Sequence, residues 1–240
     1  MLEADPVFGA VVATYPVDRM RLLLPAGALV VLVGTALNFT LAETPGWGPP
    51  LTAGLTALAA LAAGWAVLHF WNREIVLYEN GFSYREGSRV VLFHYAEIRS
   101  IRQRAEVYAY FGGLLRRAVY RLTLITIQEQ RIVVGGLYRR VGDLGERLEN
   151  HILREIAPAV RDRLAKGERV PFSDTLRLSA EGLHEGARSL PWAEFGDYRM
   201  AGGRLALMTT GGKEWFSLPL EAVDNAVLLI GLLREKKARA

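Results

Sequence analysis

Residues 22–42 read LLLPAGALVVLVGTALNFTLA, residues 51–71 read LTAGLTALAALAAGWAVLHFW, and neither stretch contains a charged side chain. Because a helix rises about 1.5 Å per residue, roughly 20 apolar residues cross the hydrocarbon core of a bilayer. The segment between them, residues 43–50 (ETPGWGPP), is rich in proline and glycine and is expected to be a loop. The sequence therefore predicts a transmembrane helical hairpin at residues 22–72.

Lysine and arginine near the helix ends indicate how this hairpin is oriented. Arg19 and Arg21 precede the first apolar stretch and Arg73 follows the second, whereas the connecting loop carries only Glu43. Since loops rich in Lys and Arg stay in the cytoplasm, both termini are expected to be cytoplasmic, with residues 1–21 as an N-terminal cytoplasmic segment. The alternative, a cleaved signal peptide, is disfavoured by the length of the first apolar stretch and by the second one that follows it.

The composition is typical of one kind of source. Arginine outnumbers lysine, and alanine, glycine and leucine are abundant, a bias that is common in GC-rich bacteria. The expected location is therefore the bacterial cytoplasmic (inner) membrane, crossed by two spans.

Small residues are expected to determine how the two helices pack. Small residues recur at Gly27 and Gly34 in the first stretch, and at Thr56, Ala60 and Gly64 in the second. The four-residue spacing of the second set lets membrane helices approach closely. Asn38 in the first stretch is expected to face the partner helix rather than to mark a transport pathway, since no ionisable residue accompanies it.

From residue 74 onward, short segments with alternating apolar residues predict β-strands, and segments with helical periodicity follow them. This order occurs twice along the chain. The expected fold class is therefore α+β with membrane helices, with two tandem small β-barrel or β-sheet units, at residues 73–167 and 168–240, that each end in a helix. The segments that match between the two units are residues 79–82 with 180–183, 95–98 with 192–195, and 121–126 with 204–209.

The order of these elements resembles that of the bacterial pleckstrin-homology-like (PH-like) domains. It consists of a strand, a glycine turn, a step of the form aromatic-x-Glu-apolar, further strands and a terminal helix. Their step often reads Trp-x-Glu-Ile, and here residues 192–195 read WAEF and residues 95–98 read YAEI. Nearly the whole chain, including the linker at residues 165–172 (AKGERVPF), is also similar to an uncharacterised bacterial membrane family classed as a domain of unknown function. The resemblance implies this architecture, and it brings no catalytic residues.

The residues that usually carry out catalysis or bind metals do not cluster in this sequence. There is no cysteine, no phosphate-binding glycine loop and no nucleophile elbow. Glu97 and Glu194 are equivalent in the two units, which predicts a shared structural task such as capping a turn. The sequence therefore predicts no enzyme, no cofactor, no metal site and, at a net charge of +4, no nucleic-acid partner. The histidines lie far apart in the sequence, at His69, His94, His151 and His184.

A difference in length between the two units indicates a candidate contact site. The first unit holds about 18 more residues than the second between matched segments, which predicts a long β-hairpin that includes residues 108–120. Residues 73–167 also carry 17 Lys and Arg against 11 Asp and Glu. The apolar and basic residues expected near the tip of this hairpin are Phe111, Leu114, Leu115, Arg116 and Arg117.

Three interpretations of this hairpin are open. In the first, the apolar tip dips into the membrane surface while the arginines bind anionic headgroups, each such charge contributing about 1 kcal/mol. In the second, the tip binds a partner protein, and in the third it packs internally as additional core.

The expected function is a membrane-anchored cytoplasmic PH-like binding or scaffold protein of unknown ligand, in contact with anionic lipid headgroups or a membrane-protein partner. The alternative is a self-assembling structural membrane protein with no small-molecule ligand. In that case the small-residue faces of the helices drive formation of an oligomer.

Overall fold

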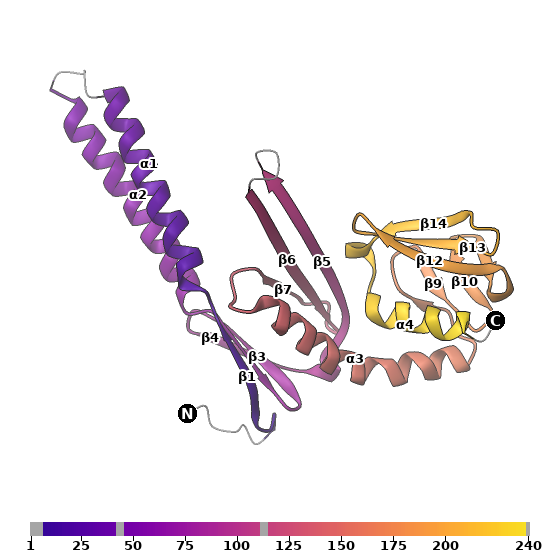
Figure 1. The fold of residues 1–240 in the computed structure, drawn as a ribbon. Helices are drawn as coiled ribbons and strands as arrows, with labels where there is room; N and C mark the ends of the chain where they lie inside the picture. The colour runs from indigo at the N-terminus through magenta and orange to yellow at the C-terminus, as the bar shows by residue number, and fades with distance from the viewer. Residues whose placement is uncertain (1–6, 42–45, 111–114, 239–240) are drawn as a thin grey trace. The chain divides into compact units, whose positions relative to one another are not determined.

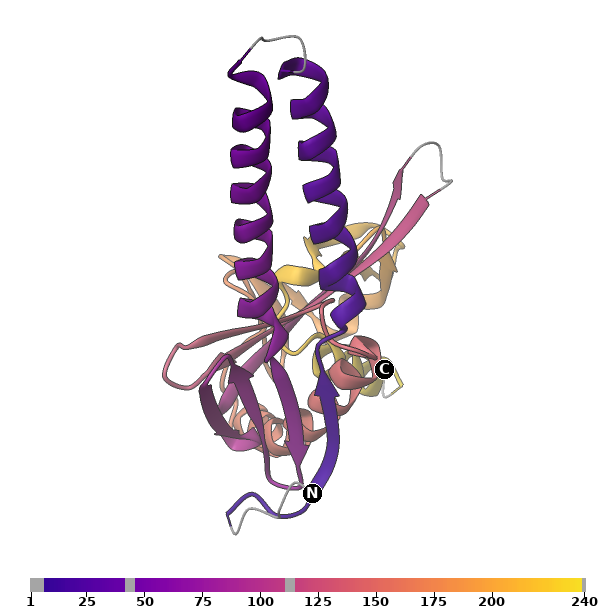
Figure 2. The same ribbon diagram turned by 90° about the vertical axis from the view of Figure 1, so that its left-hand side faces the viewer.

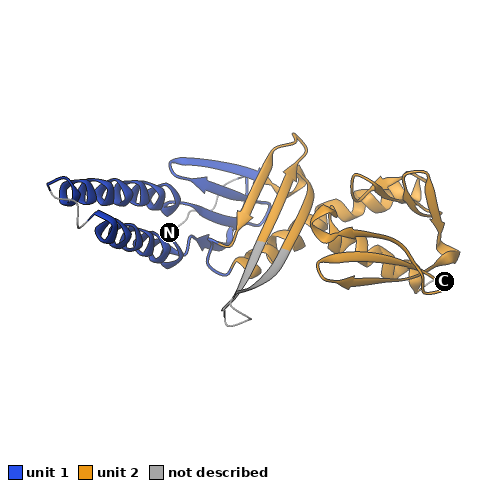
Figure 3. Cartoon of the chain, turned by 90° about the horizontal axis from the view of Figure 1, so that it is seen from above, with its two compact units in different colours: residues 1–93, 137–140 blue, residues 94–136, 141–240 orange. Residues whose placement is uncertain are grey.

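This computed structural model describes residues 7–41, 46–110 and 115–238, and it describes side chains outside residues 105–120. The chain is an α+β protein with two long apolar helices and several small antiparallel sheets (Figure 1). It divides into two compact units, residues 1–93 with 137–140, and residues 94–136 with 141–240 (Figure 3). The predicted division of the chain at residue 167 stays a prediction.

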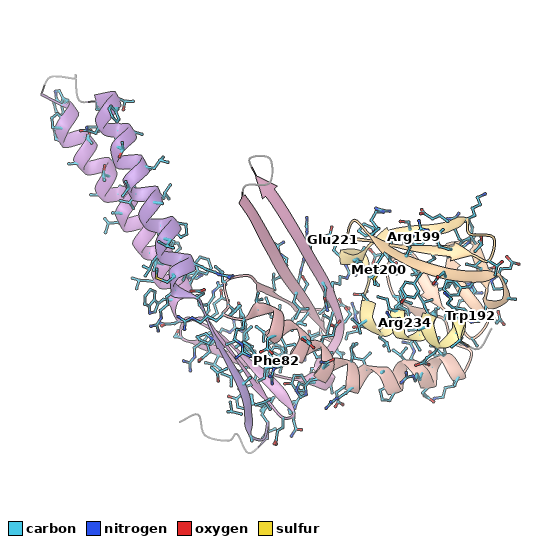
Figure 4. All side chains as sticks on the ribbon, viewed as in Figure 1. Phe82, Trp192, Arg199, Met200, Glu221 and Arg234 are labelled. Carbon is cyan, nitrogen blue, oxygen red and sulfur yellow. The ribbon has the colours of Figure 1, made fainter. Side chains whose placement is uncertain are left out.

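The first compact unit contains a four-stranded sheet in the order β1-β2-β3-β4. Strand β1 pairs antiparallel with β2, with Thr14 opposite Val76, so part of the predicted N-terminal segment 1–21 is a strand of this sheet. Phe82 on β3 is fully buried (Figure 4). The strands are β1 (Val11–Pro16), β2 (Glu74–Tyr78), β3 (Gly81–Glu86) and β4 (Arg89–His94).

Two helices, α1 (Arg19–Leu41) and α2 (Gly48–Trp71), are inserted between β1 and β2 (Figure 2). Both are long and apolar enough to cross a membrane, as predicted. Helix α2 begins within the predicted loop, because Pro49 and Pro50 occupy its first turn, where a missing N–H breaks no helical hydrogen bond.

The two helices pack through small residues, among them Gly34 and Thr56 of the predicted set. A Cβ on Gly34 of α1 would lie 3.3 Å from Cγ2 of Thr56 on α2, so the backbones approach closely there. Ala60 and Gly64 are exposed, since the partly covered face of α2 follows three- and four-residue steps rather than a strict four-residue step. The partly covered positions on either side of Thr56 include Thr52, Ala59 and Ala63.

Asn38 is also exposed rather than covered by α2. It lies three residues before the end of α1 at Leu41, so its amide is close to the expected edge of the hydrocarbon layer. An amide in that position reaches water or headgroups without a partner helix.

The second compact unit begins with a three-stranded sheet in the order β5-β6-β7, followed by helix α3 (Val141–Ala165). Helix α3 buries Leu144, Leu148 and Ile152, which lie on one face at four-residue spacing, and it continues through Pro158. It ends before Gly167, whose φ of +80° is the left-handed conformation that closes many helices. The strands are β5 (Ile98–Tyr110), β6 (Leu115–Thr126) and β7 (Arg131–Gly135).

The rest of the second unit repeats this order of elements. A four-stranded sheet in the order β11-β10-β9-β8 and a three-stranded sheet in the order β12-β13-β14 precede helix α4 (Ala226–Lys237). Leu178, Leu183, Leu207 and Leu229 belong to one buried apolar cluster there. The strands are β8 (Val170–Pro171), β9 (Leu176–Leu178), β10 (Gly182–Glu185), β11 (Arg188–Pro191), β12 (Phe195–Ala201), β13 (Arg204–Thr209) and β14 (Glu214–Pro219).

The segments that match in the sequence also make matching hydrogen bonds. The N–H of Ile127 donates to the carbonyl of Glu97, and the N–H of Thr210 donates to the carbonyl of Glu194, both at 2.8 Å. A four-stranded sheet, a three-stranded sheet and a helix therefore follow one another twice along the chain.

Candidate functional site

Strands β5 and β6 form the long hairpin that the length difference predicts. They pair from Ile98 opposite Thr126 to Tyr110 opposite Leu115, whereas β12 and β13 pair only as far as Ala201. Figure 1 shows this hairpin extending well past β7, its neighbour in the sheet. The extra residues of the first repeat thus lengthen two strands rather than form a separate domain.

The predicted contact residues lie at the far end of this hairpin. Phe111 and Leu114 fall outside the described residues. Leu115, Arg116 and Arg117 form the start of β6, opposite Tyr110, Ala109 and Tyr108, and their side chains are also outside the description. Their contact with lipid or with a partner stays a prediction.

The base of the hairpin is held by Asn225, which sequence reasoning missed. Its side-chain Oδ1 accepts the Ile101 N–H at 3.0 Å, and its own N–H donates to the Ile101 carbonyl at 2.8 Å. Its Nδ2 donates to the carbonyl of Arg99 at 3.4 Å. Asn225 adopts a left-handed φ of 52° just before α4, a conformation that asparagine tolerates better than most residues. One residue, through its side chain and its backbone N–H, thus hydrogen-bonds the free edge of β5 as a neighbouring strand would.

Two ion pairs support the same junction. Arg102 donates from Nε and Nη2 to the two carboxylate oxygens of Asp224, at 2.8 and 3.2 Å. Arg104 Nη1 lies 3.0 Å from Oε2 of Glu221, a residue labelled in Figure 4 beside the sheet β12-β13-β14. The hydrogen bond to Asp224 raises the pKa of Arg102, partly opposed by burial. We call residues 221–225 and their contacts on β5 the hairpin clamp.

A cleft of about 620 Å³ lies beside the hairpin clamp, entirely within the second compact unit. Its walls come from β5, α3, the β8–β9 segment and residues 224–225. The apolar lining includes Ile98, Ile156, Val160, Val170 and Pro171, and the arginines in the lining are Arg99, Arg102, Arg163 and Arg177. Sequence reasoning missed this cleft because its walls lie up to 129 positions apart in the chain.

The two equivalent glutamates differ in their contacts. Glu97 accepts the His94 N–H at 2.8 Å and caps a short 3-10 turn, which is the predicted structural task. The residue at the corresponding position before Glu194 is Pro191, which has no N–H to donate. Glu194 therefore cannot make the same cap.

Ser179 and His184 form another close polar pair. Ser179 Oγ and His184 Nε2 lie 2.8 Å apart, and both side chains are buried. The N–H groups of Glu181 and Gly182 also donate to Ser179 Oγ, at 3.2 and 3.3 Å. Burial lowers the pKa of His184, as does the nearby charge of Arg169. The serine oxygen thus serves the turn that leads into β10.

The described residues contain no group of three or more His, Asp or Glu side chains arranged to hold a metal ion. The fold and the site together define an α+β protein with two helices able to span a membrane, a long hairpin and a cleft at the base of that hairpin.

The chain belongs to the Family of unknown function (DUF6585), whose family model matches residues 3–240. The predicted membership of an uncharacterised family is thereby confirmed. No curated protein matches the chain.

Proposed function

We propose that this chain is a membrane-anchored, non-enzymatic binding protein of the bacterial inner membrane, with both termini in the cytoplasm. The observation that carries the proposal is the pair of apolar helices. Large apolar side chains are exposed along both, among them Leu32, Phe39, Leu61 and Leu68, each at least 66% exposed. So large an apolar surface on a soluble protein would lead to aggregation, whereas a bilayer covers it.

The place where the helices join the sheet supports the proposed topology. Helix α1 leaves β1 and α2 returns to β2, its neighbour in the same sheet, so both ends of the hairpin emerge on one side of the membrane. At that end the guanidinium of Arg19 lies 4.7 Å from the ring centre of Trp71, and that of Arg73 lies 4.4 Å from the ring centre of Phe70. Aromatic residues are typical of both membrane interfaces, and the basic residues at this end indicate the cytoplasmic one.

The repeated elements support a PH-like architecture for the cytoplasmic part. Each repeat consists of a four-stranded sheet, a three-stranded sheet and a helix, and the resemblance implies strands followed by a terminal helix. The first repeat carries the surplus of basic residues and the longer hairpin. We therefore assign to that hairpin the contact with anionic lipid headgroups or a membrane-protein partner.

Anchorage is tested by washing isolated membranes with alkaline carbonate, which releases peripheral proteins and leaves integral ones in the bilayer. We expect the full chain to stay with the membrane pellet. Release of the chain into the supernatant would contradict the proposed membrane anchorage.

The lipid contact is tested with a spin label, because the chain has no cysteine of its own. A label at Leu115→Cys, in the full chain reconstituted in nanodiscs, should become shielded from a water-soluble relaxation agent when the lipid contains phosphatidylglycerol. A label at Ser88→Cys in the exposed turn between β3 and β4 is the control and should stay accessible. Equal accessibility at both positions in every lipid would exclude the lipid contact and leave the partner-protein version.

Self-assembly is the second candidate, and the exposed small residues of α2 favour it. Nothing lies within 4 Å of the Cβ position of Gly64, and Ala60 one turn earlier is exposed, so another helix could approach closely. The variant Gly64→Cys should then form a disulfide-linked dimer in oxidised native membranes. The matched variant Ala59→Cys, on the covered side of α2, should remain monomeric, and monomers from both variants would count against assembly.

A further inference from the structure

The cleft beside the hairpin clamp contains a buried hydroxyl with no partner. Ser100 is 4% exposed, and its Oγ has no hydrogen-bond partner among the residues that the structure describes. Ser100 lines the cleft. Buried hydroxyls in native proteins are nearly always paired, and an unpaired one at a cleft suggests a partner that arrives from outside.

Strand geometry puts this hydroxyl beside an arginine. Ser100, Ile101 and Arg102 pair regularly with β6, so Ser100 and Arg102 lie on one face of β5 and Ile101 on the other. Both Ser100 and Arg102 line the cleft, whereas Ile101 does not. Asp224 fixes the guanidinium from one side through two hydrogen bonds, which leaves other N–H groups of the same guanidinium unused by that pair.

The charged groups around the cleft favour an anion. Of its acidic side chains, Asp224 is already engaged by Arg102. Asp174 lies 3.9 Å from the same guanidinium but is 95% exposed, and Glu155 is exposed on α3. Arg177 makes no ion pair within the described part of the chain, and Arg163 Nε donates to Glu168 at 2.8 Å. Guanidinium groups with unused N–H donors bind planar or tetrahedral oxyanions well.

The size and lining of the cleft set the class of ligand. Its volume of about 620 Å³ lies within the range of small-molecule sites, roughly 300–1,000 Å³. Apolar side chains of α3 and β8, including Val160 and Val170, line the same space.

We propose that this cleft binds a phosphate group that is attached to a partly apolar molecule. Arg102, Arg163 and Arg177 pair with the phosphate, Ser100 donates its hydroxyl hydrogen to it, and the apolar remainder lies against α3 and β8. Either a soluble phosphate compound or an anionic phospholipid supplies this chemistry. This cleft is separate from the hairpin tip, so binding of phosphate here does not depend on the lipid contact proposed above.

The test uses the full chain in nanodiscs of phosphatidylcholine, with two probes at constant ionic strength. Inorganic phosphate represents the soluble source and dihexanoyl phosphatidic acid represents the lipid source, and titration calorimetry measures the Kd of each. We expect at least one probe to bind. Replacing Arg163→Gln and Arg177→Gln together should raise that Kd about tenfold or more, through lost charge-assisted hydrogen bonds.

The matched control removes two exposed arginines outside the cleft, with Arg139→Gln and Arg199→Gln (Arg199 is labelled in Figure 4), and should leave the Kd unchanged. Failure of both probes to bind the wild-type chain would overturn the proposal. So would an equal loss of affinity in the control, because it would mean that net charge alone attracts the probe.

Ser100→Ala separates a ligand role from a structural one. Because the hydroxyl has no partner in the free protein, its removal should leave the melting temperature equal or higher, while the Kd of the bound probe rises severalfold. A lower melting temperature with an unchanged Kd would show that the hydroxyl supports the fold instead, which would contradict the inference.

Discussion

Two equivalent glycines show how single residues permit the strand pairing of each repeat. A Cβ on Gly81 would lie 2.3 Å from the carbonyl oxygen of Phe93, and a Cβ on Gly182 would lie 2.2 Å from that of Leu190. Each glycine begins a strand, β3 or β10, that packs tightly against the next one. Backbone atoms cannot move aside as a flexible side chain can, so both positions exclude a side chain.

We therefore predict that Gly182→Ala lowers the free energy of unfolding by about 1–3 kcal/mol, the usual cost of overpacking. Gly231→Ala is the matched control. That glycine lies in helix α4 with nothing within 4 Å of its Cβ position, so alanine should raise stability by about 0.5–1 kcal/mol. Denaturant unfolding of the full chain in detergent measures both, and equal effects would disprove the steric explanation.

A buried carboxyl group gives the stability of the second unit a dependence on pH. Burial raises the pKa of Glu149 above its usual value, a hydrogen bond with Gln103 partly opposes this shift, and the like charge of Glu146 adds to it. The folded state therefore binds this proton more tightly than the unfolded state does. The resulting stability is present below the unfolded pKa and is lost as the pH rises through the folded pKa.

Glu149→Gln should consequently be more stable than the wild type at neutral pH and no more stable below about pH 4, where the carboxyl is protonated in both states. Glu155→Gln on the exposed face of the same helix is the control and should change little. Thermal unfolding from pH 4 to pH 8 measures the difference, and a constant offset between Glu149→Gln and wild type at every pH would rule out this titration.

At the scale of elements, the hairpin clamp fixes the base of β5 through one residue in a rare conformation. Asn225→Gly keeps the left-handed φ but loses the side-chain hydrogen bonds, which leaves the buried Ile101 N–H unpaired and should cost about 1–3 kcal/mol. Asn225→Ala adds the strain of a left-handed alanine, about 1–2 kcal/mol more. Hydrogen exchange at the Ile101 amide should speed up in both variants, and unchanged exchange would contradict the clamp.

Elements defined by local pattern could be predicted from the sequence, and elements defined by distant partners could not. Helices α1 and α2 could be predicted because each is a long stretch of apolar residues without charge. The long hairpin could be predicted because the first repeat is longer than the second. Strand β1 was missed because VVATYP is short and its partner β2 begins 58 residues after β1 ends. The roles of Asn225 and Arg102 were missed for the same reason. Asn225 bonds Ile101 and Arg102 bonds Asp224, and the partners lie 124 and 122 positions apart in the chain.

The contacting faces of helices α1 and α2 show a finer limit to prediction from sequence. The sequence showed that small residues are present, but the choice between Thr56-Ala60-Gly64 and Thr52-Thr56-Ala59-Ala63 depends on how the two helices cross. Helix α1 follows β1 and α2 precedes β2, and how two helices cross is not a local property of either one.

At the scale of the whole molecule, the helical hairpin is an insertion into a sheet rather than a leader placed before it. Strands β1 and β2 pair on both sides of it. Under the proposed topology, membrane insertion and folding of the first sheet therefore depend on each other. A substitution that prevents one of the helices from inserting should therefore also disrupt the pairing of β1 with β2.

The central claim is that α1 and α2 cross the membrane and leave both ends in the cytoplasm. The absence of cysteine permits a direct measurement. Single variants Trp47→Cys, at the turn between the helices, and Ser88→Cys, in the first sheet, are exposed to a membrane-impermeant maleimide in intact and lysed bacterial spheroplasts. The account predicts labelling of Trp47→Cys in intact spheroplasts and of Ser88→Cys only after lysis. Labelling of Ser88→Cys in intact spheroplasts would contradict it, and so would the absence of labelling of Trp47→Cys before lysis.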